Sequence, residues 1–151
     1  MDALRILDNR RILWLNLTGS GNETAAHIQH NPRMTLLFCA FEGPPLILRL
    51  YGNARAVHHK DPDWETLYAH FTPQTGARQL FDLNIDTVQT SCGFGVPLMD
   101  YRGERGLLEK WAENKGQQGI ETYWRNKNQT SLDGIQTGIL EKNLPHDQTN
   151  A

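Results

Sequence analysis

Several features that would point directly to a class of protein are missing from this sequence. Only two cysteines occur, Cys39 and Cys92, far apart and without metal-ligand spacing, which argues against a disulfide scaffold and a structural zinc site. No apolar run approaches the ~20 residues that span a bilayer, and the first residues lack the pattern of a signal peptide. We therefore expect a soluble protein of the reducing cytoplasm with no membrane partner.

Neither sign of charge dominates the chain. The 15 basic and 17 acidic residues give a formal net charge of -2, so no overall field attracts nucleic acid or an anionic surface. We expect no nucleic-acid partner, and any site for an anion has to be local.

Motifs of nucleophilic catalysis are also absent. There is no Gly-x-Ser-x-Gly elbow, and neither cysteine has a histidine at motif spacing. His27 and His30 are three residues apart on a short predicted helix and could share a metal with His58, His59 or His70. Such pairs are more typical of a solvated helix face, and we predict no metal site.

What the sequence does contain is a series of apolar segments separated by glycine and proline. They predict strands at 12–17, 34–41, 46–58 and 80–95, and helices at 22–30, 61–71, 103–115 and 119–127. The run at 34–41 is nearly all apolar, as in a strand buried on both faces. Gly52 is placed where the next strand would form a bulge or bend.

The fold class predicted is mainly β with peripheral helices (α+β). Short connections favour an antiparallel or mixed sheet, closed or half-closed into a barrel. Residues 1–142 form one domain with C-terminal helices, and residues 143–151 are expected to be a polar, frayed tail.

The stretch LTGSGNET, residues 17–24, places a glycine-rich turn before a helix. It is not a dinucleotide fingerprint, because Thr24 stands where a third glycine belongs and the helix has about eight residues, too few for a parallel crossover. Two interpretations remain. The hydroxyls of Thr18, Ser20 and Thr24, the Asn22 amide and free backbone amides hold one phosphate, or the turn only caps a helix.

Two further segments leave alternatives open. Arg49 stands alone in the apolar strand LILRLYG, where an unpaired buried charge is costly. It forms an ion pair, with Glu42 or an acid on another strand, or it faces a ligand phosphate or flavin ring. The stretch QTSCGFGVPLMDY, residues 89–101, supplies either a ligand wall or core and subunit packing.

Residues 17–57 and 91–116, beginning LTGSGNET and SCGFGVPLMDY, resemble the pyridoxamine 5'-phosphate oxidase-related proteins, which are flavin-binding split barrels. The resemblance covers residues 4–133. It implies a Greek-key split barrel, usually a homodimer, that binds flavin mononucleotide (FMN) between subunits and acts as an oxidoreductase, here of unknown substrate. It also implies that the phosphate is held by Thr18, Ser20, Asn22, Thr24 and Arg49.

The sequence departs from the oxidase at two places. A Ser-Arg-Lys triplet of the oxidase corresponds here to Asn22-Glu23-Thr24, and a strand glutamine corresponds to Ile47. A glutamate repels a phosphate dianion. The alternative hypothesis is therefore a split-barrel binding or structural protein without a cofactor.

Relatives of this subgroup carry a further N-terminal segment with a strand pair and a Ser-Pro-Lys-type sequence. We therefore expect the barrel to be incomplete at its N-terminus. An apolar edge left open in this way requires a partner chain, which again favours a homodimer.

Overall fold

The structure is a computed structural model that describes residues 2–145. Its centre is an antiparallel sheet in the order β1-β2-β5-β4-β3. The strands are β1 (Leu4–Asp8), β2 (Arg11–Leu17), β3 (Arg33–Cys39), β4 (Leu46–Val57) and β5 (Ala77–Cys92). The helices are α1 (Glu23–His30), α2 (Trp64–Tyr68), α3 (Leu107–Lys127) and α4 (Ile139–Asn143).

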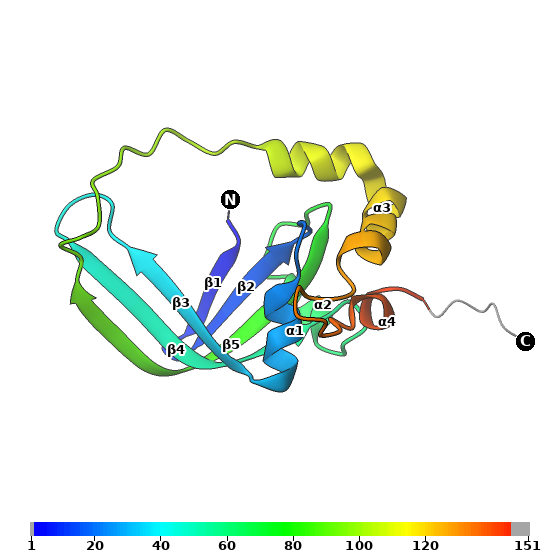
Figure 1. Ribbon diagram of the computed structural model, residues 1–151, viewed down its shortest axis with the longest axis horizontal. Helices are drawn as coiled ribbons and strands as arrows, with labels where there is room; N and C mark the ends of the chain where they lie inside the picture. The colour runs from blue at the N-terminus through cyan, green and yellow to red at the C-terminus, as the bar shows by residue number, and fades with distance from the viewer. Residues whose placement is uncertain (1, 146–151) are drawn as a thin grey trace, which may run out of the picture.

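The topology is a Greek key, as predicted. Strands β3, β4 and β5 follow one another as neighbours, while β2 lies on the far side of β5 and reaches β3 through α1. The sheet is strongly curved and remains open between its edge strands β1 and β3 (Figure 1). The fold class is confirmed in the form of an incomplete split barrel.

Helices cover the two faces of the sheet at the β2–β5 end. On one face, Trp64 and Leu67 of α2 pack in a cluster with Leu13, Leu80 and other strand residues. On the other face, α1 packs through Ala25 and Ile28 against Phe81. Leu80 and Phe81 are neighbours in the chain, and successive side chains of a strand point to opposite faces.

Further along the sheet, the face that carries α1 is covered only in part: Leu50 and Ile85 are buried in a cluster with Ile12 of β2, but the far end of the face is exposed. By register its apolar side chains include Phe38, Leu46 and Val88, which are 41%, 46% and 57% exposed. An apolar face of this kind is the inside of a barrel that lacks its closing strands.

Two features of the strands differ from the prediction. β1 was not predicted, since its five residues carry only a weak alternating pattern. The strand predicted at 34–41 is β3, an edge strand in which no residue is fully buried. A continuous apolar run does not distinguish a central strand from an edge strand that faces an open barrel.

The bulge predicted at Gly52 is confirmed. The β4–β5 register shifts between Tyr51 and Gly52. A Cβ atom on Gly52 would lie 1.9 Å from the carbonyl oxygen of Asn84, so only glycine fits there.

The two helices predicted near the C-terminus correspond to α3, which is divided by the non-helical Gly116. Its first half begins at Leu107, four residues later than predicted, after an extended segment at 93–106 that arches away from the sheet (Figure 1). Ala112 of the first half and Ile120 and Trp124 of the second half pack in one cluster with Ile139 of α4.

The predicted tail begins at Asn143, but Asn143 and Leu144 are both buried. Asn143 ends α4 and donates a hydrogen bond to the Arg78 carbonyl at 2.8 Å. The prediction of a frayed chain is wrong for these two residues, and 146–151 lie outside the described residues.

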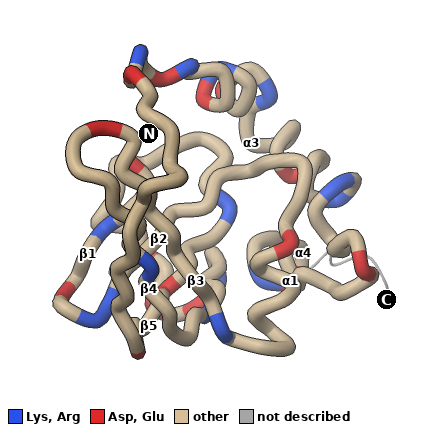
Figure 2. The backbone as a smooth tube through the Cα atoms, turned by 60° about the vertical axis from the view of Figure 1, so that its left-hand side comes forward, with Lys and Arg blue, Asp and Glu red and all other residues tan. Residues whose placement is uncertain are grey.

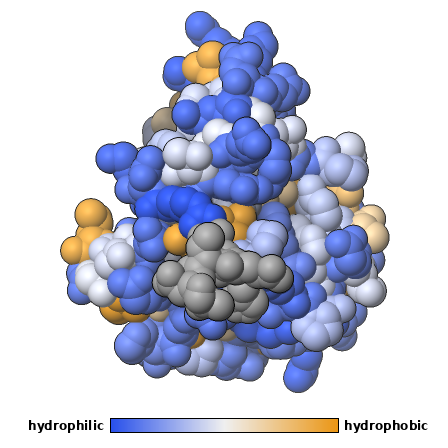
Figure 3. Space-filling model, turned by 90° about the vertical axis from the view of Figure 1, so that its right-hand side faces the viewer, coloured by the Kyte–Doolittle hydropathy of each residue, from blue (hydrophilic) through white to orange (hydrophobic). Residues whose placement is uncertain are grey.

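Charges of both signs are interspersed along the described part of the chain (Figure 2). The side of the molecule that carries the C-terminal helices is largely hydrophilic, with small separate apolar groups (Figure 3). None of the helices within residues 2–145 combines the length and apolar character needed to cross a membrane.

Candidate functional site

The glycine-rich turn lies between the end of β2 and the start of α1. Thr18 at its base is buried, and its hydroxyl donates to the Gly76 carbonyl and accepts from the Trp124 indole N–H, both at 2.8 Å. The single hydroxyl proton is used inside the protein, so Thr18 has none to donate to a phosphate. Ser20 is exposed at the tip of the turn.

Asn22 and Thr24 lie where the turn enters α1. The Asn22 side chain is buried and does not cap the helix; its Oδ1 accepts from Gln79 Nε2 at 2.7 Å. Its Nδ2 has no hydrogen-bond partner within residues 2–145. Thr24 is half-buried in the first turn of α1. A helix start without a capping side chain leaves backbone N–H groups available to an anion.

The inner side of the turn is held by two polar side chains that the sequence analysis did not identify. Asn128 Nδ2 donates to the Gly19 carbonyl and Arg78 Nη1 donates to the Gly21 carbonyl, each at 2.9 Å. Arg78 also bonds Asn16 and Asn128. No local motif contains these residues, because Arg78 is 57 residues from Gly21 and Asn128 is 109 residues from Gly19.

A cavity of about 440 Å³ opens beside the turn. The turn contributes one wall, and α3 contributes the other with Trp111 and Tyr123, whose rings meet edge to face at 5.0 Å. Lys115 Nζ lies 5.3 Å and 5.6 Å from the centres of these rings. This volume falls in the range of small-molecule sites, and the lining residues are Thr18, Gly19, Ser20, Leu107, Leu108, Trp111 and Tyr123.

Arg49 lies elsewhere, on the outer face of the sheet. Its Nη1 donates to Ser91 Oγ at 2.8 Å, and no carboxylate among residues 2–145 pairs with it, so the expected ion pair is not formed. Its neighbour across the sheet is Gln89, whereas the turn adjoins Ala77. Ala77 and Gln89 are twelve residues apart on the extended strand β5, which corresponds to about 40 Å along the strand. One subunit does not bring Arg49 to the turn.

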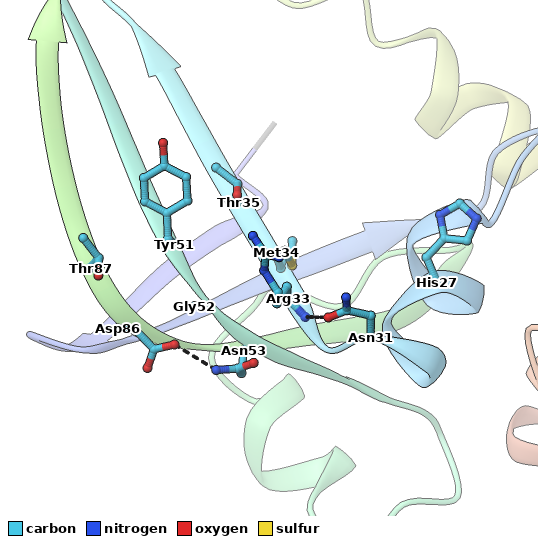
Figure 4. Close-up of a pocket in the computed structure, with 10 residues that line it drawn as sticks. All are labelled: His27, Asn31, Arg33, Met34, Thr35, Tyr51, Gly52, Asn53, Asp86 and Thr87. Atoms are coloured by element: carbon cyan, nitrogen blue, oxygen red, sulfur yellow. Dashed lines mark hydrogen bonds between the residues drawn. The ribbon is translucent and has the colours of Figure 1, made fainter.

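A second cavity of about 660 Å³ lies next to Arg49, across β3, β4 and β5. Thr35, Tyr51 and Thr87 come from the three neighbouring strands, and Asn53 donates to Asp86 at 2.8 Å (Figure 4). Its remaining lining residues are His27, Asn31, Arg33, Met34 and Gly52.

Among residues 2–145, His27 is grouped with Glu23 and Asp133 and not with His30, the histidine considered beside it in the sequence. His27 Nε2 instead lies 3.1 Å from Asp133, and the ligand atoms of Glu23, His27 and Asp133 are within 4.8 Å of one another. Hydrogen bonds from Ser131 and then His27 lower the pKa of Asp133. Glu23 Oε2 also accepts from the Leu132 N–H at 3.0 Å. These contacts join α1 to the loop at 131–135.

Comparison with known proteins places the sheet in a family. The family model for pyridoxamine 5'-phosphate oxidase matches residues 2–92, which contain all five strands of the described chain. The pyridoxamine 5'-phosphate oxidase family protein ustO of Aspergillus flavus is 33% identical over 150 residues. The alignment covers 88% of this chain but only 59% of ustO.

Among solved structures, that of a HupZ variant from Group A Streptococcus is similar with a TM-score of 0.47 and 14% identity. The match covers 59% of this chain and 73% of HupZ. The family model, the similarity to ustO and the open Greek-key sheet agree: this chain belongs to the pyridoxamine 5'-phosphate oxidase family.

Proposed function

We propose that this protein binds FMN between two copies of the chain and acts as an oxidoreductase. The observation that carries the proposal is the glycine-rich turn, which adjoins both an uncapped helix start and a cavity of about 440 Å³ with aromatic walls. Backbone N–H groups there suit a phosphate, and aromatic side chains suit a flat ring.

The fit of FMN to the residues of one subunit is incomplete. Ser20, Thr24 and the backbone of the turn supply donors, but residues 18–24 include no cation, and Lys115 lies over the aromatic rings of the opposite wall. Arg49 of a second subunit completes the site, since Arg49 is unpaired by any carboxylate among residues 2–145 and does not reach the turn of its own chain. Arginine is well suited to bind phosphate because its planar guanidinium group can donate two parallel hydrogen bonds to it.

When bound, FMN would supply hydride or two-electron transfer. The role of this chain would be to bind and orient the cofactor. The turn would hold the phosphate, and Trp111 and Tyr123 would exclude water from the cavity beside it.

The test is titration of the purified protein with FMN, followed by flavin absorbance and fluorescence. We expect micromolar or tighter binding, and the Arg49→Met variant should weaken it about tenfold or more, as for loss of a charge-assisted hydrogen bond. Arg10→Met is the matched control, because Arg10 lies in the β1–β2 turn at the far end of β2. Absence of bound flavin at micromolar protein would contradict the proposal.

One observation favours the alternative, a protein of this fold without a flavin. Glu23 in the first turn of α1 places a carboxylate next to Gly21, where it repels a phosphate. Under this alternative, the Glu23→Gln variant would still not bind FMN. Under the flavin proposal, the same variant binds FMN more tightly than the unaltered chain.

A further inference from the structure

The buried guanidinium of Arg78 carries a charge that no carboxylate neutralises. Arg78 is 3% exposed, and all its hydrogen bonds are to neutral oxygens: Asn16 Oδ1 at 2.7 Å and 3.0 Å, Gly21 O at 2.9 Å and Asn128 Oδ1 at 3.0 Å. No acidic residue within residues 2–145 forms an ion pair with it. Burial lowers the pKa of Arg78 to about 10, so the group still holds its proton at neutral pH.

The contacts of this residue also orient the turn. Arg78 and Asn128 draw the carbonyls of Gly21 and Gly19 toward the interior. The described peptide bonds are all trans, and in a trans peptide the N–H of the next residue points opposite to the carbonyl. The N–H groups of Asn22 and Ser20 are therefore turned away from Arg78, and neither has a hydrogen-bond acceptor among residues 2–145.

Two further features belong to this turn and to the cavity beside it. Asn22 is 3% exposed and its Nδ2 donor is unpartnered within the described part of the chain. Tyr123 lines the cavity beside the turn. The buried charge thus lies behind the free N–H groups of Ser20 and Asn22, and of these two residues Ser20 lines the cavity.

Building on the flavin site proposed above, we propose that Arg78 is a second cation of the phosphate corner, in addition to Arg49 of the other subunit. It acts from behind the turn: its charge attracts a phosphate monoester, and with Asn128 it presents the N–H groups of Ser20 and Asn22 to that phosphate. The basic residues that the oxidase carries within the turn are replaced by one buried arginine beneath it.

The test neutralises Arg78 without removing it. The Asn16→Asp variant has a side chain of the same shape and keeps the oxygen that accepts from Arg78. No hydrogen bond is lost, because Asn16 Nδ2 donates to nothing within residues 2–145. The new carboxylate pairs with the guanidinium. Asn84→Asp is the matched control, with the same charge change on an exposed residue six positions beyond Arg78 on β5, about 20 Å away.

FMN and riboflavin are titrated against each form, since they differ only in the phosphate. We expect Asn16→Asp to reduce FMN affinity roughly tenfold or more, the size of one full charge acting through protein, with riboflavin affinity and control affinities unchanged. The melting temperature should stay equal or rise, because a buried charge gains a partner. An unchanged ratio of FMN to riboflavin affinity in folded Asn16→Asp would overturn the role of Arg78.

A measurement with inorganic phosphate tests the role of Arg78 independently of the flavin proposal. If the unaltered chain binds neither flavin, the flavin proposal fails, and thermal stabilisation by phosphate at constant ionic strength becomes the readout. Stabilisation of the unaltered chain and Asn84→Asp but not of Asn16→Asp supports the inference. Equal stabilisation of all three forms, or of none, overturns it.

Discussion

At the scale of single residues, His58 is the clearest source of pH dependence. It is buried, and its Nδ1 lies 3.2 Å from Asn143 Oδ1 at the end of α4. Burial, and then the nearby Lys142, lower the pKa of His58 to about 4, although Asp61 and the Asn143 hydrogen bond act in the opposite direction. His58 is therefore neutral in the folded protein at neutral pH.

We predict that stability decreases as pH falls from about 6.5 toward 4. In this window the unfolded chain binds a proton at His58 that the folded chain does not, which amounts to about 3 kcal/mol at the lower end. The stability is fully present above pH 6.5. His59, whose pKa burial also lowers, adds in the same direction.

Urea unfolding between pH 4.5 and 7.5 measures this effect. The His58→Gln variant should lose most of the pH slope, whereas His70→Gln, at an exposed position, should keep it. The same slope in the unaltered chain and in His58→Gln would show that His58 is not its source.

At the scale of elements, Asp82 ties the three central strands together. It lies on β5 with its side chain 3% exposed, and it accepts hydrogen bonds from Arg11 on β2 and Arg55 on β4 at 2.8–3.1 Å. Burial alone would raise the pKa of Asp82, but the hydrogen bonds and charges of both arginines outweigh it and lower the pKa. The contribution to stability is present above the unfolded pKa and is lost as pH falls below it.

Replacement of this carboxylate should weaken the sheet as a whole. We predict that Asp82→Ala lowers the free energy of unfolding by about 2 kcal/mol, since two cations lose their shared partner, although both are partly solvated. Asp63→Ala, which removes a more exposed partner of Arg55, should cost less than about 1 kcal/mol. Equal losses in urea unfolding would mean that burial of Asp82 does not matter.

At the scale of the whole molecule, a group of exposed apolar residues at one end of the sheet marks the expected subunit contact. We call it the apolar rim, and its residues are Phe41, Leu46, Phe94, Leu98 and Met99, with exposures from 44% to 84%. The Met99 N–H donates to the Phe41 carbonyl at 3.0 Å, and Gly93 packs against Leu46. Contiguous exposed apolar surface of this kind is typical of an interface.

We predict a homodimer of about twice 17.2 kDa by size-exclusion chromatography with light scattering. Phe94→Lys in the apolar rim should shift it toward monomer at micromolar concentration. Leu132→Lys should not, because Leu132 is 98% exposed and lies in the loop beside α1, away from the rim. A stable, unaggregated monomer of the unaltered chain would contradict the dimer, and with it the contribution of a second Arg49.

The sequence by itself determined the type and order of most elements. Apolar patterning and turn residues are local signals, which is why α1, β4, β5 and the bulge at Gly52 could be predicted. The resemblance of LTGSGNET and the following strands to a family was likewise visible in the chain alone. The sequence did not distinguish β3, an edge strand, from a central strand buried on both faces. The neighbours of a strand are set by the whole sheet and not by the residues of that strand.

Only the tertiary structure decided which of the candidate site residues meet. It used the Thr18 hydroxyl inside the protein, separated Arg49 from the turn by most of β5, and brought Arg78 and Asn128 beneath it. Such contacts depend on strand register and on packing between residues far apart in the chain, for which no local pattern exists. The buried arginine beneath the turn could therefore be found only in the tertiary structure.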